Sequence, residues 1–304
     1  MTIAVLGPGG VGGLIAGALE HAGTPVSVVA RESTAQAIAR DGLRVSSVRL
    51  GEFTVHPRTL ARLTERVDVL IVATKATGLE RALERIVAQP ALVLPLLNGL
   101  DHLVVLRERF GAGAVLAGTI RVESDRPAAG VVVHTSQFLR VDMASGDPTA
   151  HAGMQALAQT LTDAGIPARV GDSEAQVMWS KLVRLNALAC TTSAFDKLLG
   201  EIRDTPALRA ELIGAIEEGC AVARAEGASI DGADPLGELS AAHATLGSSM
   251  QRDIAAGRPP ELDAIPGAVL RAAARHGIPC PTIERLVGKI AARAAYCSKG
   301  RAGA

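Results

Sequence analysis

The stretch Thr2–Gly23, TIAVLGPGGVGGLIAGALEHAG, decides the fold of the first half of the chain. TIAVL has the composition of a buried strand, and VGGLIAGALEHAG has the pattern of an amphipathic helix. Between them, Gly7, Gly9 and Gly12 form the pattern G-x-G-x-x-G. A loop that needs glycine only for positive φ angles would also contain such residues. The position directly between a strand and a helix favours a dinucleotide-binding turn instead.

Each glycine has a separate task in a turn of this kind. The first permits the tight turn, the second lets the backbone approach a pyrophosphate, and the third lets helix and strand pack closely. The amides at the start of the helix then bind the anion. We therefore predict cofactor contacts from the loop residues Gly7, Gly9, Gly10, Val11 and Gly12.

The predicted secondary structure changes near residue 170. Before it, six apolar, partly β-branched runs predict strands that alternate with helices: TIAVL, PVSVVA, VDVLIVAT, ALVLPLL, AVLAGTI and GVVVHT. This order is typical of a doubly wound α/β sheet of the Rossmann type. After it, strand signals nearly vanish, and the pattern predicts an all-α C-terminal domain. We expect the domains to span residues 1–170 and 171–304.

Caps and breakers predict five helices in the second domain. The first is capped by Asp172 or Ser173, the second starts at Thr205 and Pro206 and closes at Gly227, the third runs from about Pro235 to Gly257, the fourth ends at Gly277, and the last starts near Thr282. Pro266 should either begin the fourth helix or kink it.

The composition of the 304 residues describes a well-packed globular protein, since 48% are hydrophobic and 20% charged. The formal net charge is zero, so no electrostatic reason exists to bind nucleic acid or an anionic membrane. No apolar run approaches the roughly 18 residues that span a bilayer, and the N-terminus has no secretory signal pattern. Four widely spaced cysteines, Cys190, Cys220, Cys280 and Cys297, predict buried free thiols, no metal site and a cytoplasmic location.

Polar residues follow three of the predicted strands, at the edge where ligands of open α/β sheets bind. Arg31 follows the second strand, where NAD-specific proteins carry an acid; a guanidinium there suits the 2′-phosphate of NADP(H). Glu32 comes next and complicates this assignment. Lys75 and Asn98 follow two later strands, although an Asn-Gly pair is also an ordinary turn former. We predict NADP(H) as the cofactor.

The chain resembles the ketopantoate reductases over nearly its whole length. The resemblance rests on GPGGVGG, VVAR, ATKA, LLNGL, WSKL and SSMQRDIAAGRPPELDAIPG, in this order. It implies an N-terminal Rossmann domain, a C-terminal helical domain and NADPH-dependent reduction of 2-dehydropantoate (ketopantoate) to pantoate in pantothenate and coenzyme A biosynthesis. It also implies a small 2-oxo acid as substrate and a monomer or homodimer.

By resemblance, Lys181 and Glu261 are the catalytic pair. An ammonium held beside a growing alkoxide can donate a hydrogen bond and then a proton, the role assigned to Lys181. Glu261 is expected to bind substrate and to lie near the cofactor. Ser249 matches the serine that meets the substrate carboxylate, and Asn98 matches the asparagine between nicotinamide and substrate. Each could instead be structural, since Lys181 could snorkel at the surface and Glu261 could stabilise a helix start.

The sequence departs from the family after Lys181. The family's asparagines four and eight residues farther on are replaced by Leu185 and Ala189. Asn186 is rotated by about 140° from Lys181 on the helix, whereas Arg184 shares its face. We expect Arg184 or Asn186 to bind substrate in their place.

Three alternatives remain open, and this departure bears on the first of them. The first is reduction of another 2-oxo acid or of an imine. The second is a non-catalytic NADP(H)-sensing protein, and the third is a helical half that serves only for dimerisation.

Overall fold

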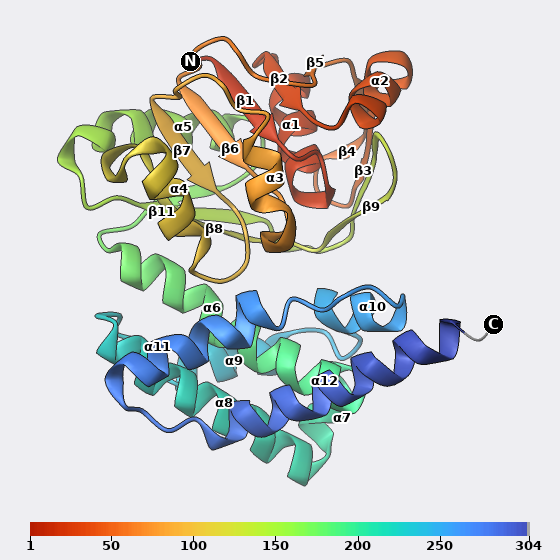
Figure 1. The fold of residues 1–304 in the computed structure, drawn as a ribbon, viewed down its shortest axis with the longest axis vertical. Helices are drawn as coiled ribbons and strands as arrows, with labels where there is room; N and C mark the ends of the chain where they lie inside the picture. Colours follow the sequence, from red (N-terminus) through yellow and green to blue (C-terminus); the bar gives the residue numbers. More distant parts are fainter. Residues whose placement is uncertain (303–304) are drawn as a thin grey trace. The chain divides into compact units, whose positions relative to one another are not determined.

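The protein is described here by a computed structural model that covers the backbone of residues 1–302 and the side chains of residues 1–297. The chain forms two compact units, Met1–Val177 and a second that begins at Met178. Within the described part of the chain, the helices are all too short or too polar to cross a lipid bilayer. Figure 1 shows the strands gathered in the first unit and helices alone in the second.

The first unit is built on a five-stranded sheet in which every neighbouring pair is parallel. Its strands, in sheet order, are β5 (Arg58–Leu60), β2 (Val26–Val29), β1 (Ile3–Leu6), β6 (Val69–Val72) and β7 (Leu92–Pro95). All four residues of β1, β6 and β7 are buried, as expected for strands covered on both faces. The helices of this unit are α1 (Gly10–His21), α2 (Glu32–Asp41), α3 (Leu79–Leu83), α4 (His102–Phe110) and α5 (His151–Asp163), with short 3₁₀ turns η1 (Ala76–Gly78), η2 (Ala112–Ala114) and η3 (Pro148–Ala150). The predicted α/β class is confirmed.

Two smaller sheets complete the unit. One has the order β4 (Gly51–Val55), β3 (Leu43–Ser47), β10 (Val131–His134) and β9 (Ser124–Ala128), and the other β12 (Ala168–Val170), β11 (Arg140–Ala144) and β8 (Ala117–Arg121). All six predicted strands exist, but the last two, β8 and β10, lie in these sheets rather than in the parallel one. The sequence reading missed β3, β4, β5, β9, β11 and β12, because their partly exposed residues lack the continuous apolar signal.

Helix α1 lies against the four-stranded sheet, and two of its glycines explain how. A Cβ atom added at Gly13 would lie 2.6 Å from Val132, and one at Gly17 would lie 2.6 Å from Val45. Glycine at these positions therefore lets the helix approach β10 and β3 closely, so that α1 packs between two layers.

His134 in β10 is a buried titratable group, only 1% exposed. Its Nδ1 atom lies 2.8 Å from the Ser47 hydroxyl and its Nε2 atom 3.1 Å from the Ser136 hydroxyl. Burial lowers the pKa of His134 from its ordinary value. Below about pH 6.5, His134 therefore binds a proton more readily in the unfolded chain than in the folded one. The free energy of unfolding should fall as the pH drops through this range.

We expect the melting temperature of the protein to be independent of His134 above about pH 6.5 and to fall by a few degrees as the pH drops below it. The His134→Gln variant should lose part of this pH dependence, whatever its stability at pH 8. Thermal melts of both proteins from pH 8 down to pH 5 test this, and parallel curves for the two proteins would contradict it.

The second unit is helical throughout its described residues. Its helices are α6 (Glu174–Phe195, which starts in the first unit), α7 (Leu199–Asp204), α8 (Pro206–Ala225), α9 (Ala233–Ala241), α10 (Ser249–Ala255), the π-helix η4 (Asp263–Gly267), α11 (Ala268–His276) and α12 (Pro281–Ala302). Several predicted boundaries are confirmed. The Ser173 hydroxyl accepts the Gln176 amide at 3.3 Å as an N-cap of α6, Thr205 is the N-cap of α8, and Gly277 ends α11 with a φ of +65°.

The single helix predicted from about Pro235 to Gly257 is wrong. The structure has two helices there, α9 and α10, separated by residues 242–248. The Ser248 hydroxyl accepts the Gln251 amide at 3.1 Å and so begins a new helix. The sequence Ser-x-x-Gln at positions 248–251 is a known start signal, and it could have revealed this break.

Pro266 lies inside the π-helix η4, just before α11. Because proline has no amide hydrogen, the carbonyl of Leu262 instead accepts from the Gly267 amide, five residues on, at 2.9 Å. Pro266 therefore lies in a wide turn that leads directly into α11, at the place where the sequence predicted either a helix start or a kink.

The cysteines follow the prediction with one exception. Cys190, Cys220 and Cys280 are buried free thiols, but Cys297 is only half-buried. Burial raises the pKa of Cys190 to about 12 and that of Cys280 to about 11. These two thiols are structural rather than reactive groups.

Candidate functional site

The glycine loop has the geometry of an anion cradle. Gly7 has a φ of +89°, and the Gly9 amide donates to the Gly7 carbonyl at 2.8 Å, which closes the turn. A Cβ on Gly12 would lie 2.3 Å from the Gly7 oxygen, so this position must stay bare for helix and strand to pack. Around Gly9, in contrast, an added Cβ would meet no atom within 4 Å. Gly9 thus leaves open the side from which a phosphate can reach the start of α1.

Strand β9 braces the same loop from the four-stranded sheet. The Ser124 hydroxyl donates to the Gly10 carbonyl at 2.9 Å. A Cβ on Gly10 would lie 2.4 Å from the backbone carbonyl oxygen of Ser124, so the two backbones are in direct contact. The sequence reading missed Ser124, because nothing local marks a contact across 114 residues. Val11, the next loop residue, is half-buried at the start of α1.

The other predicted cofactor residues lie at the same sheet edge as the loop. Arg31 follows β2, Lys75 follows β6, and Asn98 follows β7, while β1 leads into the loop itself. Since these four strands are adjacent and parallel, their carboxyl ends share one edge. Arg31 and Lys75 are exposed and Asn98 is half-buried, with Gly99 in a turn at a φ of +86°.

Glu32, which complicated the cofactor assignment, is bound by another arginine. Arg85 Nη1 lies 3.2 Å from Glu32 Oε1. The pKa of the Glu32 carboxyl is lowered mainly by a hydrogen bond from its own backbone amide, and to a smaller extent by the hydrogen bond from Arg85. The carboxylate is therefore charged at neutral pH and engaged with Arg85.

The predicted catalytic residues both belong to the second unit, and both are buried. Lys181 of α6 and Glu261 before η4 are each only 8% exposed. Each takes part in a polar or electrostatic interaction. Lysine and glutamate are rarely buried without such an interaction, so neither residue is a solvated surface charge. The snorkelling alternative for Lys181 does not fit this burial.

The residues offered in place of the family's asparagines have different surroundings. Arg184 Nε lies 3.2 Å from Glu238 Oε2 of α9, at an angle that is too poor for a hydrogen bond. Asn186 is fully buried, and its Oδ1 accepts from the Cys190 thiol at 3.4 Å. Among the described residues, no hydrogen-bond acceptor is present for its Nδ2 atom. Leu185 is half-buried and Ala189 buried, so α6 is apolar at the two positions where the resemblance led us to expect amides.

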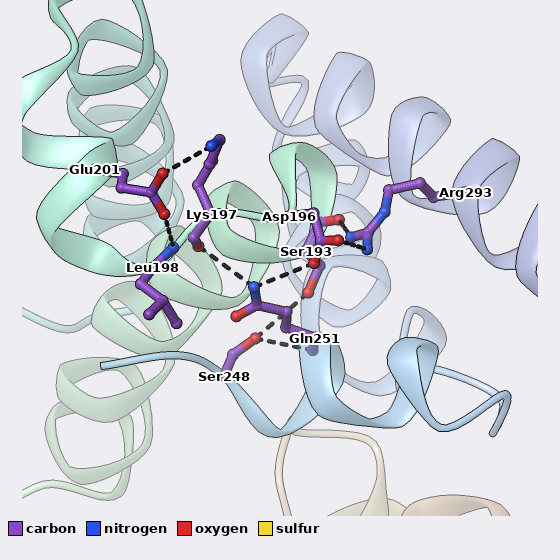
Figure 2. A network of polar contacts seen from close by, with 8 residues as sticks. All are labelled: Ser193, Asp196, Lys197, Leu198, Glu201, Ser248, Gln251 and Arg293. Atoms are coloured by element: carbon purple, nitrogen blue, oxygen red, sulfur yellow. Dashed lines mark hydrogen bonds and ion pairs between the residues drawn. The ribbon is translucent and has the colours of Figure 1, made fainter. Parts of the chain in front are cut away.

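Ser249 is the exposed first residue of α10, and buried polar groups fix the start of this helix. Ser248 is 3% exposed, and its hydroxyl accepts from Thr192 of α6 at 2.9 Å. Figure 2 shows Gln251 reaching back toward the end of α6, where its amide lies 3.4 Å from Asp196 Oδ1. Ser248 was not among the predicted site residues.

Arg293 of α12 completes this polar network, as Figure 2 also shows. It donates to the Ser193 carbonyl and forms an ion pair with Asp196 at 2.7 Å. Asp196 is the one non-glycine residue of the described chain with positive φ, at +54°, directly after α6. The network thus joins the end of the lysine-bearing helix to the helices that begin at Ser249 and Pro281.

An ion pair anchors the turn after α10. Arg258 Nε donates to Asp253 Oδ1 at 2.7 Å, and the Arg258 amide donates to the Asp253 carbonyl at 2.8 Å. Asp253 is 4% exposed, so this pair fixes the Gly-Arg-Pro-Pro turn that leads to Glu261.

Taken separately, the units offer complementary chemistry. The first presents a helix start, an open glycine loop and polar side chains along one sheet edge, which fits a dinucleotide. The second holds a buried lysine and a buried glutamate, which can donate protons and bind hydroxyl groups.

Sequence comparison matches both units to one family. The profile described as ketopantoate reductase PanE/ApbA matches residues 3–146, and that described as ketopantoate reductase PanE/ApbA C terminal matches residues 175–294.

Individual relatives agree in length and fold. The chain is 30% identical to the uncharacterized oxidoreductase YkpB of Bacillus subtilis, over 95% of this chain and 98% of that protein. It is 32% identical to the 2-dehydropantoate 2-reductase of Mycobacterium tuberculosis, over 95% of this chain and 97% of that protein. The crystal structure of 2-dehydropantoate 2-reductase from Geobacter metallireducens superposes with a TM-score of 0.87 at 26% identity, over 95% and 99% of the two chains.

Proposed function

Because the chain belongs to the ketopantoate reductase family and is therefore an oxidoreductase acting on CH–OH groups, we propose that it reduces 2-dehydropantoate to pantoate with NADPH. This reaction would serve pantothenate and coenzyme A biosynthesis. The observation that carries the proposal is a lysine and a glutamate, each 8% exposed, in the helical unit of a chain whose other unit presents an open dinucleotide loop.

The cofactor proposal rests on the first unit. The loop residues Gly7, Gly9, Gly10, Val11 and Gly12 would hold the pyrophosphate, and Lys75 and Asn98 would line the same edge. Arg31 would bind the 2′-phosphate, which distinguishes NADPH from NADH. An NAD-specific site would need a carboxylate available for the ribose hydroxyls, and Glu32 is engaged with Arg85.

When bound, NADPH supplies a hydride to the carbonyl carbon of the substrate. The ammonium of Lys181 then donates a hydrogen bond to the carbonyl oxygen and transfers a proton to it as negative charge develops. Glu261 binds a substrate hydroxyl group and orients the ammonium. Ser249 would bind the substrate carboxylate, and Asn98 would help to hold the nicotinamide and the substrate.

A second candidate substrate has its own support. Leu185, four residues after Lys181, and the buried Ala189 make this face of α6 apolar. A site with fewer amide groups would favour a 2-oxo acid with an apolar substituent over the hydroxylated 2-dehydropantoate. Asn186, with its unsatisfied Nδ2 atom, is a better polar candidate than Arg184, which lies beside Glu238.

The proposal also covers the role of each domain, the oligomeric state and the location in the cell. We assign cofactor binding to residues 1–170 and the substrate and catalytic groups to residues 171–304. We propose a monomer or homodimer in the cytoplasm, where free thiols such as the buried Cys190 persist.

One assay tests the proposal directly. NADPH oxidation is followed with the purified protein against a panel of 2-oxo acids that includes 2-dehydropantoate, with NADH in parallel. We expect turnover of at least one 2-oxo acid, with kcat/KM for NADPH about tenfold or more above that for NADH.

The outcomes separate the alternatives. Turnover of another 2-oxo acid but not of 2-dehydropantoate would support the second candidate substrate. Tight NADPH binding without turnover of any 2-oxo acid or imine would instead support a non-catalytic sensor. Equal kcat/KM values for NADH and NADPH would overturn the role of Arg31.

A further inference from the structure

A second arginine lies beside Arg31 at the edge of the parallel sheet. Strands β2 and β5 are parallel neighbours, and their last paired residues are Val29 and Leu60. The Ala30 amide continues the ladder by donating to the Leu60 carbonyl at 3.0 Å. Arg31 and Arg62 each follow the last pair by two residues, so they leave the two strands at the same level. Both are exposed.

The loops that carry these two arginines are tied together by Arg85. Its Nη1 atom donates to the Ala61 carbonyl at 3.0 Å and to Glu32 Oε1 at 3.2 Å. Ala61 precedes Arg62, and Glu32 follows Arg31, so Arg85 links the loop after β5 to the start of α2. The Arg85 side chain is 20% exposed, which makes it a structural tie rather than a surface group.

This arrangement also leaves positive charge at the ends of β2 and β5. The nearby carboxylate, Glu32, is engaged with Arg85. Among the described residues, the structure shows no ion pair to Arg31 or to Arg62. Two arginines that leave neighbouring strands at the same level can bind one dianion together, since each guanidinium can donate two hydrogen bonds to phosphate oxygens.

We propose that Arg62 is a second specificity-determining residue of this protein, which binds the 2′-phosphate of NADPH together with Arg31. The inference rests on the proposed NADPH dependence and adds a residue to it. Arg85 would act as a positioning residue, because it pairs with the Glu32 carboxylate and binds the carbonyl of Ala61, directly before Arg62.

The test isolates the 2′-phosphate by using two small nucleotides on the full-length protein. Calorimetry measures the binding of 2′,5′-ADP, which carries the phosphate, and of 5′-ADP, which lacks it. We expect Arg62→Ala to weaken 2′,5′-ADP binding about tenfold, the value of one lost charge-assisted hydrogen bond. Binding of 5′-ADP should change by less than about twofold, and kcat/KM should fall for NADPH but not for NADH.

Arg66→Ala is the matched control. Arg66 is also exposed and lies in the same segment, but just before β6, at the opposite end of the strands. Arg66→Ala removes one positive charge, as Arg62→Ala does, so it shows how far the loss of long-range attraction alone weakens nucleotide binding. We expect wild-type affinity for both nucleotides in this variant.

Two results would overturn the inference, and they are distinguishable. If the wild-type protein prefers 2′,5′-ADP and Arg62→Ala keeps that preference, Arg62 has no role while the NADPH proposal stands. If the wild-type protein binds both nucleotides equally, the NADPH preference is wrong and the role of Arg62 falls with it.

Discussion

Replacing Lys181 by alanine is expected to lower kcat for the 2-oxo acid about a thousandfold, within the range for loss of a general acid. Lys181 is the one proposed donor of the proton that the substrate oxygen receives during hydride transfer. NADPH binding should change little, because the residues assigned to the cofactor belong to the other unit. Steady-state kinetics with fluorescence titration of NADPH checks both expectations.

Because Lys181 is only 8% exposed, its removal could also disturb folding, and two controls address this. Lys197→Ala removes an exposed lysine that pairs with Glu201 at 2.7 Å just after the same helix, and should leave kcat unchanged. Small primary amines should restore part of the activity of Lys181→Ala, which a purely structural defect would not allow. A variant that keeps kcat within about threefold of the wild type would exclude Lys181 as the acid.

Local patterns predicted the parts of the fold that local chemistry controls. The glycine loop, the cap at Thr205 and Pro206 and the end of α11 at Gly277 all depend on residues within one turn of one another. The pairing of β10 with β3 joins residues almost 90 positions apart, and no local pattern encodes it. The same limit explains why Ser124 was missed, since its contact with Gly10 depends on that second sheet.

The candidate site divides in the same way. Arg31, Lys75 and Asn98 could be grouped from sequence, because parallel strands bring their carboxyl ends to one edge. Arg62 follows β5, a strand of three residues with no continuous apolar run, so its place beside Arg31 emerged only from the register. Lys181 and Glu261 were singled out by resemblance, since neither the spacing nor the composition of the chain connects them.

Replacing Gly9 by valine is expected to weaken NADPH binding about a hundredfold while leaving the fold intact. The backbone at Gly9 has φ −79° and ψ −162°, which any residue can adopt, and an added Cβ would meet no atom of the protein within 4 Å. The new side chain would instead fill the space through which a phosphate approaches α1. Isothermal titration with NADPH and a thermal melt measure the two effects.

Variants of two other glycines separate an effect on NADPH binding from an effect on stability. Gly12→Val should lower the melting temperature itself, because its Cβ would lie 2.3 Å from the Gly7 carbonyl oxygen. Gly146→Val, at an exposed site with open space, should change neither stability nor NADPH affinity. If Gly9→Val bound NADPH as tightly as the wild type, the open side of the loop would not be the phosphate path, and the anion would have to be held by the strand-end side chains alone.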